Sequence, residues 1–208
     1  MAGMDEASLV ADLKASLHDA GSVFADDDSD FQRHLALAAL DLGRKVPRIL
    51  SSELALEADV AVYDAPSDLI RPVSHRWGAA AIRRRNPWDR GWPGRLPRLT
   101  AEGDAAEGRV LVLIPPPTAD QITALGAALP YTYRAVHQVG DAEADTTVQP
   151  AHRGLLLLRA QAEAMKELAA RNIAKPVQLR DGQGGAPKNG VPASLHAQLM
   201  DAFERGAA

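Results

Sequence analysis

The chain has 208 residues, no cysteine, a net charge of −4 and only 4% aromatic residues. The absence of cysteine excludes a disulfide scaffold and thiolate metal sites, and the net negative charge argues against general affinity for nucleic acid. The N-terminus lacks the pattern of a signal peptide, and the longest apolar run, Leu155 to Leu158, is far too short to span a bilayer. We therefore expect a soluble protein without membrane contact.

The start of the chain predicts two amphipathic helices. Leucines recur every fourth residue between 6 and 20, and apolar residues alternate at spacings of three and four between 30 and 46. Gly21 ends the first pattern and Pro47 ends the second. Because the connection between them is short, we expect an antiparallel helix pair.

An acidic cluster, Asp26, Asp27, Asp28 and Asp30, precedes the second helix. It lacks the alternating oxygen ligands, the central glycine and the closing glutamate of a calcium loop. Carboxylates at the start of a helix accept bonds from its free N–H groups and oppose its dipole. We therefore interpret the cluster as a helix cap rather than a metal site.

Residues 52–78 are the most strand-like part of the chain. Apolar and polar residues alternate there in three short runs, which Asp59 and Pro66 separate. This pattern predicts a small antiparallel meander with one buried face. Two further strands are predicted at 109–114 and 129–139, and the second alternates along its whole length.

Between these strands, residues 82–99 contain six Arg, three Pro, two Trp and one Asp. This density of Pro and Gly excludes a long helix or a central strand and predicts a loop or an extended arm. Arg beside Trp is typical of interaction surfaces. In the alternative interpretation, the Trp side chains fold back on the meander and the Arg side chains are only solvated. The residues expected to contact a partner or a neighbouring subunit are Arg83, Arg84, Arg85, Trp88, Arg90, Trp92 and Arg95.

A third long helix is predicted at 150–173, where leucines cover more than one side. Such a helix either lies at the centre of the fold or meets another subunit. The candidates for an inter-subunit contact on it are Leu156, Leu157 and Arg159. The fold class is therefore α+β: a helical bundle of the N-terminal pair and this helix, with a small antiparallel sheet or sandwich and the extended arm.

The end of the chain, residues 176–208, is predicted to be a tail separate from a core of residues 1–175. Residues 180–192 have the composition of a flexible linker, and residues 193–205 predict a short amphipathic helix. A tethered terminal helix is typical of a docking element, and the alternative is that it packs on its own domain. The side chains expected to dock are Leu195, Leu199, Met200 and Phe203.

Motifs for catalysis or metal binding are missing from the sequence. None of the six histidines joins a second ligand at helical spacing, and no nucleophile elbow or dinucleotide-binding glycine motif occurs. The glycine-rich stretch at 181–190 lacks the Gly-Lys-Ser/Thr ending of a phosphate loop. We therefore expect no enzyme activity, no cofactor and no metal.

In the order of its elements the chain resembles the head–tail connector, or adaptor, proteins of tailed bacteriophages. Tyr63 to Arg71, with the sequence YDAPSDLIR, is similar to the Y-x-x-P-x-D-hydrophobic element of that family. The two helices before it, the strand that ends at Pro115, the strand with Tyr131 and the long helix from Pro150 follow the family's order. The linker and the terminal helix are similar to its tail.

This resemblance implies a structural protein of the virion neck that is assembled in the host cytoplasm. Such adaptors form a dodecameric ring under the portal protein, extend the DNA channel and carry the stopper or tail-completion protein. Genomic double-stranded DNA then passes through the lumen without sequence-specific binding. The subunits of a closed ring meet through two different surfaces, and a net negative charge keeps DNA from sticking. The terminal helix is then expected to dock on the portal or on a neighbouring subunit.

Two other functions remain open from the sequence. A nucleic-acid-binding module would use the same arm, together with Arg98, to hold phosphate and stack on bases. A small hydrolase would need a site that the motifs do not reveal.

Overall fold

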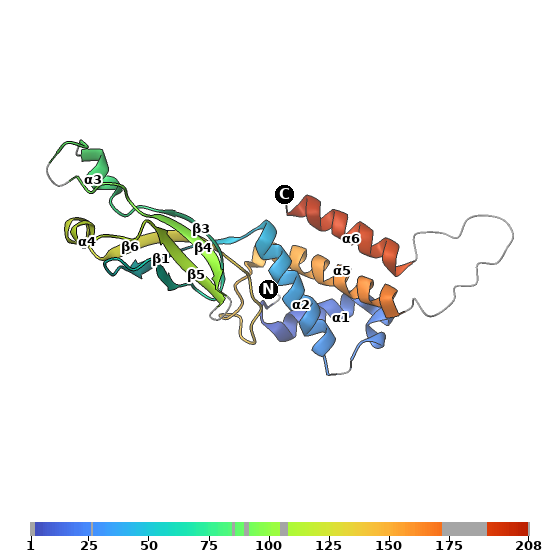
Figure 1. Ribbon diagram of the computed structural model, residues 1–208. Helices are drawn as coiled ribbons and strands as arrows, with labels where there is room; N and C mark the ends of the chain where they lie inside the picture. The colour runs from blue at the N-terminus through green and yellow to red at the C-terminus, as the bar shows by residue number, and fades with distance from the viewer. Residues whose placement is uncertain are drawn as a thin grey trace. The chain divides into compact units, whose positions relative to one another are not determined.

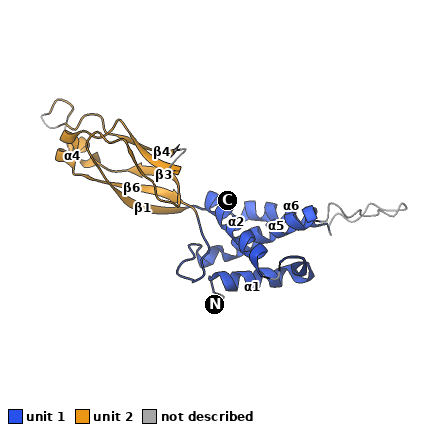
Figure 2. Ribbon diagram, turned by 60° about the horizontal axis from the view of Figure 1, so that its bottom comes forward, with its two compact units in different colours: residues 1–47, 137–208 blue, residues 48–136 orange. Residues whose placement is uncertain are grey.

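The chain folds into two compact units, and its described residues have an α+β fold. The computed structural model describes residues 3–25, 27–84, 86–89, 92–104, 108–171 and 191–207. These residues form six α-helices and two antiparallel sheets of three strands each, which confirms that the fold is α+β (Figure 1). A helical unit comprises residues 1–47 and 137–208, and a β unit comprises residues 48–136 (Figure 2). The β unit is therefore an insertion into the helical unit.

The described part of the helical unit contains four long helices, and each of the other three packs against α5. Leucines of α1, α2 and α5 meet Phe203 of α6 in one apolar core. This arrangement explains why leucines cover several sides of α5. None of the helices in the described ranges is long and apolar enough to cross a membrane. The long helices are α1 (Glu6–Leu17), α2 (Ser29–Lys45), α5 (Arg153–Arg171) and α6 (Pro192–Gly206).

Both helices predicted at the start of the chain are confirmed, with small shifts of their ends. α1 begins where expected because the Asp5 carboxylate accepts a hydrogen bond from Ser8 N at 2.9 Å and caps the helix. It ends at Leu17, and the chain continues as a 3₁₀ turn from His18 to Val23. α2 matches its predicted range to within one residue at each end.

The described part of the β unit contains two sheets, with the strand orders β1-β6-β3 and β2-β5-β4. Neighbouring strands are antiparallel in both sheets. The strands are β1 (Arg48–Ala55), β2 (Val62–Asp64), β3 (Leu69–His75), β4 (Arg98–Asp104), β5 (Gly108–Ile114) and β6 (Ala128–Ala135).

The predicted meander of residues 52–78 is wrong. Its three runs form β1, β2 and β3, but β6 lies between β1 and β3, and β2 belongs to the other sheet. β6 occupies the central position, and its side chains alternate as predicted, with Leu129, Tyr131, Tyr133 and Ala135 buried. Alternation of this kind fixes the register of a strand that must cover a core. β6 ends at Ala135, before the predicted end at residue 139.

Both sheets contribute to one apolar core. Leu69 comes from the first sheet, and Leu111 and Leu113 come from the second. Arg109 of β5 adds a polar link between the sheets, because its Nη1 donates to the carbonyl oxygens of Leu69 and Ile70, each at 2.6 Å. The two sheets therefore stabilise each other.

Two elements, α3 (Ala79–Arg84) and β4, lie where the sequence predicts no regular structure. The composition of β4 is poor for a strand, since it includes Glu102 and Gly103. It forms because it pairs with β5 along its whole length. The helix α4 (Ala119–Leu125) begins with reciprocal capping bonds between Thr118 and Gln121.

The terminal helix α6 packs on its own unit, which is the second of the two alternatives for the tail. Its Phe203 side chain is 1% exposed. His196 Nδ1 donates to Ala162 O of α5 at 2.8 Å, and Glu204 pairs with Lys45 of α2. Most of the predicted linker before α6 lies outside the described residues.

We expect Phe203→Ala to lower the free energy of unfolding by about 3–5 kcal/mol, because it removes a fully buried aromatic ring. Leu195→Ala on the same helix is the matched control. Leu195 is 39% exposed, and its truncation should change the stability by only about 0.5 kcal/mol. Urea unfolding followed by circular dichroism measures both. Equal, small effects would show that α6 does not pack on this unit in solution.

Candidate partner-binding site

The predicted arm of residues 82–99 is shorter than expected, because both its ends lie in regular structure. Its first residues belong to α3, and its last two residues begin β4. Gly78 precedes α3 with a φ of +71°, and a Cβ at this position would lie 2.9 Å from the side chains of Leu96 and Leu125. A glycine therefore lets the chain turn close to the core as it enters the arm.

Trp88 lies at the tip of a closed turn in the arm. Asp89 N donates to Asn86 O at 2.9 Å, and Asn86 N donates to the Asp89 carboxylate at 2.7 Å. Pro87, at the second position, presets the backbone of this turn. The Trp88 side chain is 81% exposed, whereas Trp92 is partly buried. Trp88 is therefore exposed, as the interpretation of an interaction surface expects, and Trp92 is partly covered by the protein, as the alternative expects.

The second half of the arm follows a fixed path back to the β unit. Gln121 Nε2 of α4 donates to Pro93 O at 2.8 Å and to Arg95 O at 3.0 Å. His75 Nε2 donates to Pro97 O at 2.9 Å. The sequence analysis missed Gln121, although the Thr-x-x-Gln capping pattern was the signal that marked the start of α4. An arm held in this way loses little further freedom when it binds a partner.

The cationic side chains of the arm include three that are exposed and have no ion pair within the described residues: Arg83, Arg84 and Arg95. Two others that were predicted to contact a partner, Arg85 and Arg90, lie outside the described residues. The described arm therefore presents one large aromatic side chain and several unpaired cations.

The α5 residues predicted to meet another subunit lie inside the helical unit. Leu156 is fully buried in the core, and Leu157 packs partly against it. Arg159 is 5% exposed, and its Nη2 donates to Asp41 Oδ2 and to Glu163 Oε1, each at 2.6 Å. The helix is therefore central to its unit, which is the other alternative that the sequence left open.

The four side chains predicted to dock from the terminal helix have different environments. Phe203 is buried, Leu199 and Met200 are partly buried, and Leu195 is exposed. Leu195, at 39% exposed, is the only exposed one of the four, because the helix places Phe203 in the core and Leu199 against it.

A stripe of charged residues on α5 is a feature that the sequence analysis missed. Arg159, Glu163, Glu167 and Arg171 recur at a spacing of four, which places them on one side of the helix. Their partners on α2 include Asp41. Charged residues that recur at every fourth position of an otherwise apolar helix are the sequence signal for such a line of polar contacts.

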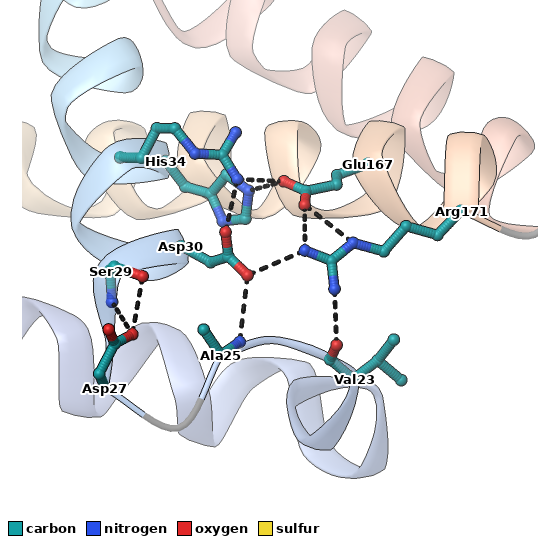
Figure 3. A network of polar contacts seen from close by, with 9 residues as sticks. Val23, Ala25, Asp27, Ser29, Asp30, His34, Glu167 and Arg171 are labelled. Atoms are coloured by element: carbon teal, nitrogen blue, oxygen red, sulfur yellow. Dashed lines mark hydrogen bonds and ion pairs between the residues drawn. The ribbon is translucent and has the colours of Figure 1, made fainter.

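At one end of this stripe a network of polar contacts joins α2 to α5 (Figure 3). The Glu167 carboxylate accepts from Arg33 Nη2 at 2.7 Å, from His34 Nε2 at 2.8 Å and from Arg171 Nε at 2.9 Å. The Asp30 carboxylate accepts from Arg33 Nη2 at 2.7 Å and from Arg171 Nη2 at 2.9 Å. Two arginines therefore bridge two carboxylates across the helix pair.

These contacts lower the pKa of both carboxylates. The hydrogen bond from Arg33 is the largest cause for Asp30, and together with the bonds from Ala25 N and Arg171 it lowers the pKa to about 2. For Glu167, burial raises the pKa, but the hydrogen bonds from His34, Arg33 and Arg171 outweigh burial and lower it. Both side chains stay ionised at neutral pH and hold the arginines in place.

The acidic cluster before α2 acts in part as predicted. Asp27 Oδ1 accepts from Ser29 N at 3.2 Å and caps the helix. Asp28 occupies the N-cap position, but its side chain makes no capping bond and pairs with Lys14. Asp26 lies outside the described residues. Within the described ranges, no group of three or more His, Cys, Asp or Glu is placed to hold a metal ion.

The element at Tyr63 to Asp68, on which the family resemblance rests, is part of the scaffold. Tyr63 Oη accepts from Glu57 N at 3.1 Å and donates to Val60 O at 3.2 Å, which fixes the corner between β1 and β2. Asp68 accepts from Tyr133 Oη at 3.2 Å. Burial and the Asp68 carboxylate raise the pKa of Tyr133. The element thus holds strands together.

No protein-family model and no curated protein matches this chain. Its function is therefore interpreted from the geometry of its own residues and from the order of its elements. In the described part of the arm, Trp88 is exposed, and so are arginines that form no ion pair with another described residue.

We expect the stability of the helical unit to fall as the pH decreases from about 4 to about 2, where Asp30 is protonated in the folded state. The pKa of Asp30 is lowered on folding, so its contribution is complete above the unfolded-state pKa and is lost as the pH falls through the folded-state pKa. Asp30→Asn should lower the melting temperature at pH 6 and converge with the wild type near pH 2.

Asp201→Asn is the control, because Asp201 forms only an exposed pair with Arg205. Its melting curve should follow that of the wild type at every pH. Melting temperatures that are equal for Asp30→Asn and the wild type at pH 6 would contradict the role given to this network.

Proposed function

We propose that this protein is a head–tail adaptor of a tailed bacteriophage. In this proposal twelve copies form a ring under the portal protein, extend the DNA channel and provide the attachment platform for the stopper or tail-completion protein. The order of the elements supports it, since two helices, strands with the Tyr63 to Arg71 element, a long helix and a terminal helix follow one another as in that family.

The arm is the observation that carries the proposal of a partner-binding protein. Trp88 remains 81% exposed on a turn that its own hydrogen bonds close. A rigid aromatic side chain among unpaired arginines is the composition of residues that dominate binding energy in protein interfaces. Such a feature has no stabilising role within the described part of the β unit.

The helical unit limits where subunits and partners meet. Its central helix α5 is enclosed by α1, α2 and α6, and α6 buries Phe203 in the same core. These helices therefore serve the fold of the single chain. In a ring, the subunits therefore meet through surfaces that remain exposed, and the arm is the most distinct of these surfaces.

We expect rings with twelve-fold symmetry when the purified protein is mixed with the portal protein encoded by the same genome. Electron microscopy of the negatively stained mixture detects them. Trp88→Ala should weaken portal-dependent assembly about 30-fold, as for an interface residue worth about 2 kcal/mol. Ile49→Ala is the control, because Ile49 is an exposed apolar residue of the same unit. The proposal fails if the wild-type protein forms no ring on the portal.

Nucleic-acid binding is the second candidate function, because exposed Arg83 and Arg84 accompany the exposed Trp88. We expect the adaptor to show only weak binding to double- and single-stranded DNA at 150 mM salt, and filter binding measures it. Affinity in the nanomolar range that falls steeply with salt and is lost in Arg83→Ala, Arg84→Ala would favour this second function.

A further inference from the structure

The helical unit has a groove between α1 and the start of α2, near the loop that contains Asp141. Its volume is about 350 Å³, and it is open to solvent. Ala7 and Ala11 lie on successive turns of α1 and are exposed, with Val10 at the base. Two alanines one turn apart leave a flat, apolar shelf, which is a suitable support for an aromatic ring.

The rim of this groove carries carboxylates. Asp28 is already paired with Lys14. Glu6 and Asp141, in contrast, have no ion-pair partner among the described residues. Glu143 and Asp145 follow in the same exposed loop. The rim therefore keeps a negative charge that the unit itself does not neutralise.

Hydrogen bonds hold this acidic loop against the start of α1. Glu6 N donates to Gly140 O at 3.1 Å. Gly140 N in turn donates to Thr146 Oγ1 at 3.1 Å. Gly140 also has no space for a side chain, since a Cβ there would lie 2.5 Å from the Cβ of Asp145. The carboxylates are thus presented from a fixed position beside the apolar shelf.

The arm has the complementary chemistry. It carries the exposed indole of Trp88 on a closed turn. Arg83 and Arg84, on the helix before this turn, are also exposed and form no ion pair with a described residue. The groove carries an apolar shelf with unpaired carboxylates at its rim. Neither these arginines of the arm nor the carboxylates Glu6 and Asp141 of the groove have an ion-pair partner among the described residues. The two sets are opposite in charge, and the indole and the alanine shelf are both apolar.

From this match we infer that the arm of one copy binds the groove between α1 and α2 of a second copy. Trp88 lies on the shelf of Ala7 and Ala11, and the arginines pair with Glu6 and Asp141. The two surfaces are different parts of the chain, so the contact can repeat head to tail from copy to copy, and such a repeat closes a ring when the rotation allows it. The inference rests on the proposed function and names its subunit contact.

The absence of cysteine from the chain makes a direct test possible. Trp88→Cys protein is mixed with Ala11→Cys protein and treated with a short bismaleimide, both at high concentration and on the portal. Mixing single-cysteine variants detects only contacts between copies. Ala197→Cys replaces Ala11→Cys in the control, since Ala197 is an exposed alanine on a helix of the same unit, outside the groove. The expected result is a cross-linked heterodimer with Ala11→Cys, formed at least tenfold faster than with Ala197→Cys.

Exchange of charges tests whether the contact is direct. Arg83→Glu with Arg84→Glu should weaken self-association or ring assembly at least tenfold, and Asp141→Arg alone should also weaken it. The three substitutions together should restore part of the assembly, because the side chain of Asp141→Arg then faces an introduced glutamate, while Glu6 still faces a like charge. Asp141 lies in a loop, so its replacement leaves the helix intact. Failure of the combination to restore assembly would contradict this pairing.

The outcomes separate this inference from the proposed function. Rings on the portal with no faster cross-linking at Ala11 than at Ala197 overturn the inference and leave the adaptor function in place. Cross-linking at Ala11 without rings on the portal supports the contact between copies and overturns the adaptor function. If neither rings nor the specific cross-link forms, both are overturned.

Discussion

Helix α5 is enclosed by three other helices, and this enclosure determines how its charged residues are used. A charge taken out of water must find a partner, because an unpaired buried charge is strongly destabilising. The Arg159 guanidinium meets Asp41 and Glu163, and Glu167 meets His34 and two arginines. These pairs require one register between α2 and α5. These polar contacts between α2 and α5 therefore select one packing arrangement, and the apolar core stabilises it.

The enclosure of α5 also leaves few of its side chains available for contact with another protein. The apolar sides of α5 pack within its own unit, as does the Phe203 face of α6, and the exposed residues of α5 include Lys166 and Ala170. The β unit differs, because Gln121 and His75 hold a loop in place without covering its tip. A loop fixed at its base with a free aromatic tip combines low entropy cost on binding with a large contact area. The exposed aromatic tip thus belongs to the β unit and not to the helical unit.

The sequence predicts the helices well and the strand pairing poorly, for a physical reason. Helical periodicity depends on neighbours three and four residues away, and Leu9, Leu13 and Leu35 carry that information within their own segment. Strand pairing depends on residues far apart, so alternation predicts that β6 has one buried face but not that it lies between β1 and β3. In the arm, composition indicated a binding surface, yet the exposed fractions in the folded chain show that Trp88 is free and that Trp92 is partly buried.

The insertion of the β unit has its two ends side by side. Within the β unit, Arg48 at the start of β1 is paired with Ala135 at the end of β6. Within the helical unit, His137 Nε2 is 2.9 Å from Val46 O, so the two points where the chain leaves and returns are joined there as well. A module whose entry and exit coincide can be exchanged for a short turn or for another module without moving its host. The arm lies within this inserted module, so it can change in sequence or length without altering the helical framework.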